Sequence, residues 1–396
     1  MKKMSLLLAT LAFSHTAFSH TVNFNDEALI ETELAVSLSY SYRNKTYVAP
    51  TADWQIPGTL MGGEALPVDD DAALDDATAD YRYALSRNNG FQLSAEAHGG
   101  HGETEFKFSH YWYMHQWRTD NSTLRLEAGK MFAAFTPHAN WHASQDAYSE
   151  ASLTGDILWG RSLVDKGIRA SEQRGAWSYG VELWQGDSWL ANNGHAGDLF
   201  ARYDGQYHNL KYQLGAWLLS AEANERRDTR YFGGHSHGNV VVTSNDASFT
   251  GDILAGGIDG ELEISIAHHN TLRLGLSLTQ LEYDGLVQES QREASINSQY
   301  QSTQLEATWQ NGRHQLSSRY ENLTLDNTMT GAAAILVGRN TSLDNPDGID
   351  PKRTTLSYRF QYSSNLTLRT EWIDESFGNI DQQRWLVGFV LHGIFN

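Results

Sequence analysis

The segment Leu272-Arg-Leu-Gly-Leu-Ser-Leu278 alternates between leucine and a small or charged residue. The same period of two runs through Leu34-Ala-Val-Ser-Leu-Ser-Tyr-Ser-Tyr42 and Leu356-Ser-Tyr-Arg-Phe-Gln-Tyr362. Successive side chains of a β-strand point to opposite faces, so each segment predicts a strand with one apolar and one polar face. In a membrane barrel the apolar face looks out to lipid and the polar face into a wet lumen.

The connections between such segments alternate in length. Short polar turns include Arg87-Asn-Asn-Gly90 and Thr119-Asp-Asn-Ser122. Long connections are expected near residues 45–79, 135–161, 225–247, 285–301 and 327–352. A closed antiparallel membrane barrel has this alternation, with tight periplasmic turns at one rim and long extracellular loops at the other. A soluble β-sandwich does not require all of its long loops to lie at one end.

We therefore predict an all-β protein, a transmembrane antiparallel β-barrel of about sixteen strands. The expected strands of the first half are 33–43, 80–87, 91–98, 104–117, 123–134, 162–171, 176–185 and 198–207. Those of the second half are 211–224, 249–264, 271–284, 302–310, 313–326, 353–363, 366–375 and 384–395.

The N-terminal residues predict secretion. Met1-Lys2-Lys3 precedes an apolar stretch over residues 4–13 and the small-residue motif Ala17-Phe-Ser19. We expect a signal peptide over residues 1–19 and a barrel over 20–396; the alternative is a buried N-terminal helix. No later segment approaches the ~20 apolar residues of a transmembrane helix. With a mean hydropathy of −0.49, membrane insertion has to use strands.

The charge of the chain limits its partners. Acidic residues number 48 against 29 basic ones, giving a formal net charge of −19. This balance argues against nucleic acid, whose phosphates need a basic surface, and favours the attraction of cations. Cysteine is absent, so disulfides and thiolate metal sites are excluded.

Charged side chains are also expected on the inward faces of the strands. The basic ones are Arg82, Lys107, Arg125, Arg169, Arg202, Arg359 and Arg369, and the acidic ones are Glu96, Glu127, Glu182, Asp259, Glu261, Glu263, Glu306 and Glu371. Facing arrays of opposite sign would orient dipolar solutes. The simpler interpretation is that the charges keep the lumen wet and balanced.

The last segment, Trp385-Leu-Val-Gly-Phe-Val-Leu-His-Gly-Ile-Phe395, places mostly large apolar side chains on one face. It resembles the C-terminal strand of bacterial outer-membrane barrel proteins, from which it departs because Asn396 follows the terminal aromatic residue. The predicted size resembles that of the general and substrate-selective porins. That resemblance implies an outer-membrane location, contact with outer-membrane lipid and a homotrimer.

A narrower resemblance is to the phosphate-selective O and P porins. Leu124-Arg-Leu-Glu-Ala-Gly-Lys130 leads into the long third loop, Asp165-Lys-Gly-Ile-Arg-Ala170 follows it, and a hairpin comes at 175–181. Phosphate selectivity in that family depends on a lumen lined by arginine and lysine. Because this chain is acidic, we do not expect it to transport phosphate.

The resemblance to porins implies that the third long loop folds into the lumen and forms its constriction. The side chains expected at the narrowest path are His138, His142, Asp146, Glu150 and Asp156. Carboxylates around a narrow pore favour cations over anions. Alternatively, these groups lie on an extracellular lobe and contribute only solubility.

Histidine is the unusual element of the sequence, with 16 residues. Seven are expected in or beside the long connections of one rim: His98, His101, His138, His142, His195, His235 and His237. Imidazole with nearby carboxylate is the ligand set for Zn²⁺ and related transition metals, and the spacings His-x-His and His-x₃-His let two rings converge on one ion. The alternative is that these are solvated loop residues without a ligand.

These features favour a passive outer-membrane porin that admits small hydrophilic solutes and prefers cations. A sharper hypothesis is the uptake of zinc or another transition metal. The alternative is a non-transporting surface barrel, an adhesin or binding protein that acts through its long loops. An enzyme is not expected, since the sequence has neither a phosphate-cradling glycine loop nor a His-Glu-x-x-His helix. No cofactor is required by this interpretation.

Overall fold

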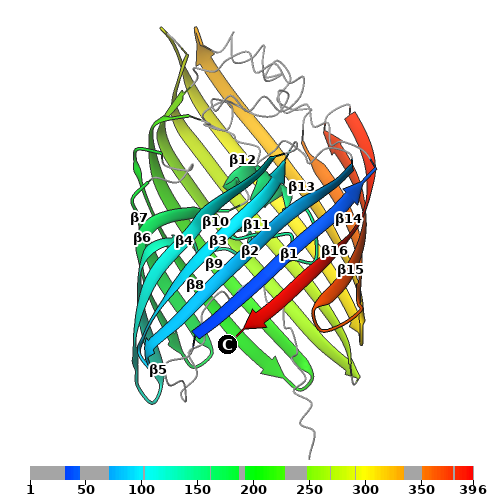
Figure 1. Ribbon diagram of the computed structural model, residues 1–396. Helices are drawn as coiled ribbons and strands as arrows, with labels where there is room; N and C mark the ends of the chain where they lie inside the picture. Colours follow the sequence, from blue (N-terminus) through cyan, green and yellow to red (C-terminus); the bar gives the residue numbers. More distant parts are fainter. Residues whose placement is uncertain are drawn as a thin grey trace, which may run out of the picture.

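The computed structural model describes residues 32–44, 71–100, 103–160, 162–186, 192–227, 248–267, 269–289, 291–333, 350–377 and 380–395. Its sixteen strands form one closed antiparallel barrel (Figure 1). The strands of the first half are β1 (Thr32–Arg43), β2 (Asp71–Ser86), β3 (Asn89–Gly100), β4 (Glu103–Arg118), β5 (Ser122–Phe132), β6 (Val164–Arg174), β7 (Trp177–Trp184) and β8 (His195–Tyr207). Those of the second half are β9 (Leu210–Arg226), β10 (Ser248–Ala267), β11 (Asn270–Glu289), β12 (Arg292–Asn311), β13 (His314–Gly331), β14 (Lys352–Gln361), β15 (Leu366–Phe377) and β16 (Ile380–Phe395).

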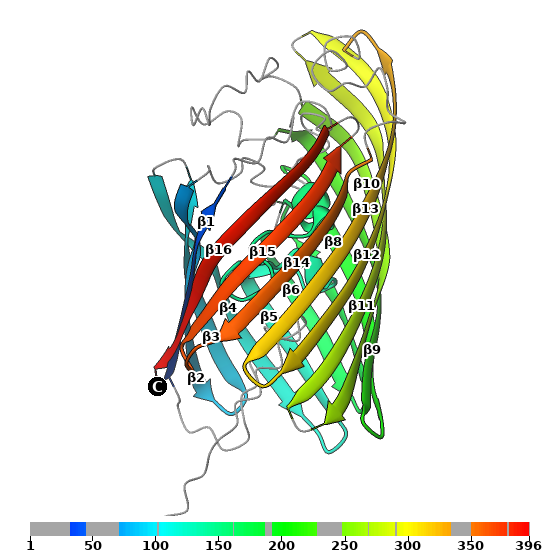
Figure 2. The same cartoon turned by 90° about the vertical axis from the view of Figure 1, so that its right-hand side faces the viewer.

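The first and last strands close the barrel. β1 pairs with β16 in a continuous antiparallel register from Leu34 opposite Phe395 to Arg43 opposite Leu386. Both views show strands that are strongly tilted against the barrel axis (Figures 1 and 2), as closure of a sheet requires. The prediction of a closed, sixteen-stranded antiparallel barrel is confirmed.

The outer surface of the barrel is apolar, as the alternation of the sequence predicts. On β11, Leu274, Leu276 and Leu278 are 40%, 42% and 37% exposed, whereas Ser277 between them is 8% exposed and faces inward. Leucine and aromatic side chains occupy the outward positions of most other strands as well. A closed barrel with an apolar outer band and a polar interior is the architecture of a transmembrane barrel.

Among the residues that the structure describes, no helix is long and apolar enough to cross a membrane.

The two rims differ as predicted, with two exceptions. At the rim that carries the C-terminus, at most four residues separate consecutive strands, as between β14 and β15. At the other rim the connections after β1, β5, β9 and β13 are long. The prediction of a long connection near 285–301 is wrong, because β11 and β12 run on to Glu289 and Arg292. The neighbouring strands β10 and β13 pair with them almost to the tip of this hairpin. The connection that follows His98 is also short, since β4 begins at Glu103.

The first long connection is shorter than expected for a similar reason. β2 begins at Asp71, so Asp71, Asp75 and Asp76 lie on a strand and not in the loop to which the sequence assigned them. The predicted signal peptide, residues 1–19, lies outside the described residues.

Candidate pore constriction

The connection between β5 and β6 folds into the barrel instead of projecting from its rim, as the resemblance to porins implies. We call residues 133–163 the inner loop; all of them except residue 161 are described. It contains the 3-10 turn η1 (Pro137–Ala139) and the π-helical turn η2 (Thr154–Leu158), and its helical ribbon is visible between the walls of the barrel in Figure 2. Most of its residues from 133 to 159 are buried or half-buried.

The two ends of the inner loop pack against β9 through an aromatic cluster. The ring of Phe135 lies 4.8 Å from that of Trp217 on β9 and 5.6 Å from that of Trp159, and the two tryptophans are 5.8 Å apart. Phe135 and Trp159 are at most 1% exposed. Burial of each large apolar side chain contributes about 1.5–3 kcal/mol, so this cluster attaches the loop to one wall without polar contacts.

Charged residues of the same wall hold the first turn of the inner loop. Glu182 on β7 accepts the backbone N–H of Ala134 at 2.9 Å. Arg169 on β6 pairs with Glu182 and with Glu127, and donates to the carbonyl of Phe132. These groups therefore fix the point at which the chain leaves β5.

The opposite wall presents a row of buried arginines to the middle of the inner loop. They come from the last four strands and are Arg319, Arg353, Arg359, Arg369 and Arg384. Arg369 Nη1 donates to the carbonyl of Ala143 at 2.7 Å, and Arg353 Nη1 donates to the carbonyl of Ala151 at 2.9 Å. Irregular backbone needs such partners because a buried carbonyl without a hydrogen bond is costly.

Two further arginines complete the row. Arg359 Nη1 donates to the carbonyl of Asp146 at 3.2 Å. Arg319 Nη2 donates to the carbonyls of Glu150 at 3.0 Å and Ala151 at 3.1 Å, while its Nε pairs with Glu321 at 2.9 Å. The arginines therefore act as donors to the loop backbone, and carboxylates of the wall compensate their charge.

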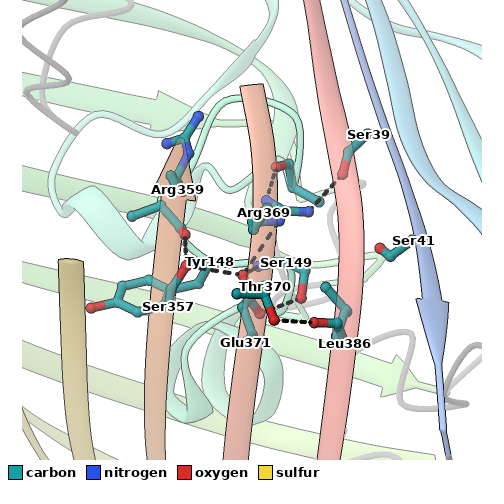
Figure 3. Close-up of polar contacts among 12 residues, drawn as sticks. Ser39, Ser41, Tyr148, Ser149, Ser357, Arg359, Arg369, Thr370, Glu371 and Leu386 are labelled. Atoms are coloured by element: carbon teal, nitrogen blue, oxygen red, sulfur yellow. Dashed lines mark hydrogen bonds and ion pairs between the residues drawn. The ribbon is translucent and has the colours of Figure 1, made fainter. Parts of the chain in front are cut away.

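Wall carboxylates accept the backbone N–H groups of the inner loop in turn. Asp76 accepts from Ser144 at 2.9 Å, and Glu321 accepts from the N–H of Leu153 at 2.6 Å. Glu371 accepts from both the N–H and the hydroxyl of Ser149, at 2.9 and 2.5 Å (Figure 3). Hydrogen bonds to ionised groups are the stronger class, so three strands far apart in the sequence hold successive parts of one loop.

Glu150 is the residue of the inner loop most tightly tied to the wall. Arg384 on β16 donates to both of its oxygens, with Nε 3.1 Å from Oε1. Burial alone would raise the pKa of Glu150, but the charges of Arg384 and Arg353 outweigh it and hold the pKa well below its usual range. Asp156 lies 3.6 Å from Arg353, so both carboxylates compensate wall arginines.

The two histidines of the inner loop have opposite environments. His142 Nδ1 lies 3.4 Å from Asp76, and its Nε2 lies 4.0 Å from Glu96. Burial lowers its pKa, but the hydrogen bond to Asp76 and the surrounding carboxylates outweigh burial and raise it. For His138, burial dominates and the charge of Arg319 adds to it, which lowers the pKa to about 4. His138 is therefore neutral at pH 7.

Asp146 faces open space below the inner loop. A cavity of about 180 Å³ lies on the side of the short turns, between this part of the loop and strands β10 to β16. A smaller one of about 100 Å³ adjoins it, and both are lined by Asp146, Glu261, Gly275 and Glu306. A third cavity, about 430 Å³, lies against the opposite wall, where Arg125, Arg202 and Asp204 line it.

Neither the search of protein-family models nor the search of curated proteins finds a match. Solved structures of bacterial outer-membrane proteins share the architecture. A loop-deletion mutant of the Vibrio cholerae outer-membrane protein OmpT has a TM-score of 0.54 at 10% identity, with 92% of this chain and 99% of that chain covered. Pseudomonas putida OprB has a TM-score of 0.54 at 13% identity, over 92% and 94% of the two chains. The outer-membrane channel DcaP of Acinetobacter baumannii has a TM-score of 0.52 at 9% identity, over 92% and 97%.

This chain has the fold of the bacterial outer-membrane porins. The apolar outer band and the closed sheet place it in the bacterial outer membrane. The porin fold explains why an irregular loop inside the lumen is tolerated, because non-helical backbone at membrane depth has to be buried in protein or line a wet cavity.

Within this porin fold, the histidines considered as metal ligands are dispersed. His138 lies 3.9 Å from Asp259, and His142 lies beside Asp76. His195 begins β8 and pairs with Glu222 at the exposed rim, 3.6 Å away. His98 lies on β3, and His101, His235 and His237 lie outside the described residues. In the described part of the chain, no three His, Asp or Glu side chains gather closely enough to hold a metal ion.

Sequence reasoning missed several of the residues that hold the inner loop. Arg319, Arg353 and Arg384 were not singled out, nor were Glu321 and Glu375. Glu375 acts through Arg353 and Arg384, with which it pairs at 2.7 Å in each case. A signal was present in the sequence, since Arg319 and Glu321 occupy alternate positions of β13 and therefore share its inward face. The third loop itself was expected in the lumen, but its partners on distant strands were not.

Proposed function

We propose that this protein is a passive diffusion channel of the outer membrane that admits small hydrophilic solutes and prefers cations. The observation that carries the proposal is the inner loop, which is held inside the lumen by both walls and leaves cavities lined with charged groups beneath it. A loop fixed in this way narrows the path, and size and charge at the narrowing then select the solute. The likeness to a solved outer-membrane channel supports this role.

The charged groups around the inner loop favour cations. In the described part of the chain, the arginines that bind it or its partners number eight: Arg43, Arg169, Arg202, Arg319, Arg353, Arg359, Arg369 and Arg384. The carboxylates of the loop, and those of the described wall that bind the loop or these arginines, number ten: Asp75, Asp76, Glu127, Asp146, Glu150, Asp156, Glu182, Glu321, Glu371 and Glu375. The surplus is negative, and a narrow, low-dielectric path focuses such a field.

An enzymatic role has little support. The letters Gly-x-Ser-x-Gly occur at Gly234-His-Ser-His-Gly238, but that motif acts at a strand-to-helix turn above an α/β sheet. Here the segment lies between two antiparallel strands of a barrel, β9 and β10, and it lies outside the described residues. We infer a channel and not a hydrolase.

Planar-bilayer recording tests the proposal. We expect stable conductance steps and, in a KCl gradient, a reversal potential whose sign corresponds to cation preference. Asp146→Asn is expected to reduce that preference, because Asp146 faces the cavities below the loop. Glu222→Gln serves as the control, since Glu222 is exposed at the rim beside His195. Anion selectivity would refute the charge argument, and a barrel without conductance would favour a surface-binding role through the long loops.

Zinc uptake is the sharper form of the proposal. It is supported by the sequence pattern Gly-Gly-His-Ser-His-Gly around His235 and His237, a spacing that suits two imidazoles on one ion. Equilibrium dialysis of the purified barrel against Zn²⁺ measures it, with His235→Ala/His237→Ala as the variant. His208→Ala is the matched control, because His208 lies at a turn of the opposite rim. Zinc retention that is absent, or equal in variant and control, removes this form and leaves the channel proposal intact.

A homotrimer is also proposed, on the basis of the resemblance to porins. Chemical crosslinking in native membranes measures it directly. A single band at the size of one chain would exclude it.

A further inference from the structure

The smaller cavity beneath the inner loop has an unusual set of lining groups. Its charged and titratable residues are His138, Asp146, Asp259, Glu261, Glu306 and Arg319. Four carboxyl groups therefore face one guanidinium. The imidazole adds no positive charge at pH 7, because burial keeps it neutral.

The single guanidinium is already occupied. Arg319 gives its Nε to Glu321 and its Nη2 to two loop carbonyls, and it lies 4.3 Å above the ring of Tyr148. Its charge is thus shared between Glu321 and two carboxyl groups of the cavity, Glu306 and Asp146. The cavity keeps a negative balance even with Arg319 in its lining.

A buried acceptor lies in the wall of the same cavity. Gln304 on β12 is 5% exposed and lines the cavity. Its amide nitrogen donates to Glu306 at 2.8 Å, which fixes the orientation of the amide. Its carbonyl oxygen has no hydrogen-bond partner among the described residues. A buried carbonyl left in this state costs free energy, and a donor placed in the cavity would recover it.

The hydroxyl of Tyr148 behaves similarly at the neighbouring cavity. Tyr148 is 2% exposed, lines the cavity of about 180 Å³, and its hydroxyl finds no partner in the described part of the chain. The two cavities meet at Asp146, Glu261 and Glu306, which line both. These three carboxyl groups therefore border both spaces.

We propose that this cavity is a binding subsite for the N–H-bearing cationic head group, ammonium or guanidinium, of a permeating solute. Such a group donates hydrogen bonds to several acceptors at once, which a quaternary ammonium, without N–H groups, cannot do. The size agrees, because a cavity of roughly 150 Å³ holds a molecule like benzene, and about 100 Å³ holds a head group alone. The remainder of the solute occupies the adjoining cavity. The inference rests on the proposed channel and names its preferred class of solute.

Block of the KCl current by putrescine tests this subsite. We expect putrescine to interrupt single-channel current in a concentration-dependent way, and tetramethylammonium, which has no N–H donor, to do so far more weakly. Glu306→Gln should weaken the block about 10- to 100-fold, the range for a hydrogen bond between charged groups. Gln304→Met, which removes the buried carbonyl without changing the charge, should weaken it about 2- to 10-fold.

Glu172→Gln is the matched control, because Glu172 lies on β6 and lines the cavity at the opposite wall. If it weakens the block as much as Glu306→Gln does, or if tetramethylammonium blocks as well as putrescine, the subsite is refuted. A conducting, cation-preferring channel that putrescine does not block refutes the subsite and leaves the proposed function standing. A barrel that does not conduct refutes the proposed function. In that case, dialysis of labelled putrescine against the detergent-solubilised barrel and its Glu306→Gln variant tests the subsite separately. Equal retention of putrescine by the two proteins would refute the subsite.

Discussion

Replacing Glu371 by alanine is expected to release the middle of the inner loop from the barrel wall. The carboxylate of Glu371 is fully buried, accepts two hydrogen bonds from Ser149, and lies 3.3 Å from Nε of Arg369. Alanine leaves the N–H and hydroxyl of Ser149 without an acceptor and Arg369 without part of its charge compensation. Removal of one partner of a buried, hydrogen-bonded ion pair costs about 3–5 kcal/mol.

The substitution destabilises the inner loop and not the sheet, because the backbone hydrogen bonds of β15 with β14 and β16 do not involve the side chain of Glu371. We therefore expect local opening of the inner loop to become easier by about two to three and a half orders of magnitude, at about 1.4 kcal/mol for each tenfold change. Amide hydrogen exchange of residues 143–156 in detergent-solubilised protein measures it. The N–H groups of Ser144 and Leu153, which bond to Asp76 and Glu321, report whether the loop opens as one unit.

Two further variants serve as controls for Glu371→Ala. Glu371→Gln keeps one acceptor oxygen for Ser149 and should show a smaller loss of protection than Glu371→Ala. Glu222→Ala removes a carboxylate from an exposed pair at the rim and should leave loop exchange unchanged. Unchanged protection over residues 143–156 in Glu371→Ala, with the barrel intact, would show that the wall carboxylates do not hold the loop.

Three further predictions concern pH and packing. Because the pKa of His138 is lowered to about 4, the folded loop binds fewer protons than the unfolded loop between pH 6.5 and 4. The stability of the loop should therefore fall by about 3 kcal/mol as the pH is lowered through that window. Amide exchange measured against pH should show this fall in the wild-type protein and not in His138→Asn. The pKa of His142 is raised by Asp76 and its neighbours. Its contribution to the stability of the loop is therefore full below pH 6.5 and is lost as the pH rises through the raised pKa. In His142→Gln this decrease in loop stability with rising pH should be absent. Gly251→Ala should lower the thermal stability of the refolded barrel, because a methyl group there would clash with the backbone oxygen of Asp284 on β11. Gly256→Ala on the same strand should not, because its nearest neighbours lie 3.5 Å away.

The strands were predictable wherever the membrane imposes a pattern. Segments such as Leu272–Leu278 cross the lipid and must put apolar groups outward, which produces the period of two. The hairpin of β11 and β12 continues past that zone, through Gln288, Glu289, Arg292 and Glu293. Beyond the lipid no apolar face is needed, so an extended strand has the composition of a loop there. The start of β2 at Asp71 was misassigned for the same reason.

The candidate constriction was predictable as a loop but not as a set of contacts. Its charged residues could be found because they stand together in sequence, as Asp146, Glu150 and Asp156 do. Their partners are up to 234 positions away, as for Glu150 and Arg384, and such pairs depend on the closed barrel that brings the last strands beside the third loop. Two of the expected constriction carboxylates consequently compensate wall arginines, a role that local spacing does not reveal.

The closing pair of strands, β1 and β16, has a consequence for assembly. The inner loop spans this seam from within, because Ser144 bonds to Ser37 on β1 while Glu150 bonds to Arg384 on β16. Contacts between such remote parts of a chain form late, since the entropy of bringing the ends together must be overcome first. We therefore expect the pairing of β1 with β16 and the docking of the inner loop to occur together, late in folding. A variant that weakens the loop contacts across this seam should spend longer as an open sheet at the membrane before the barrel closes.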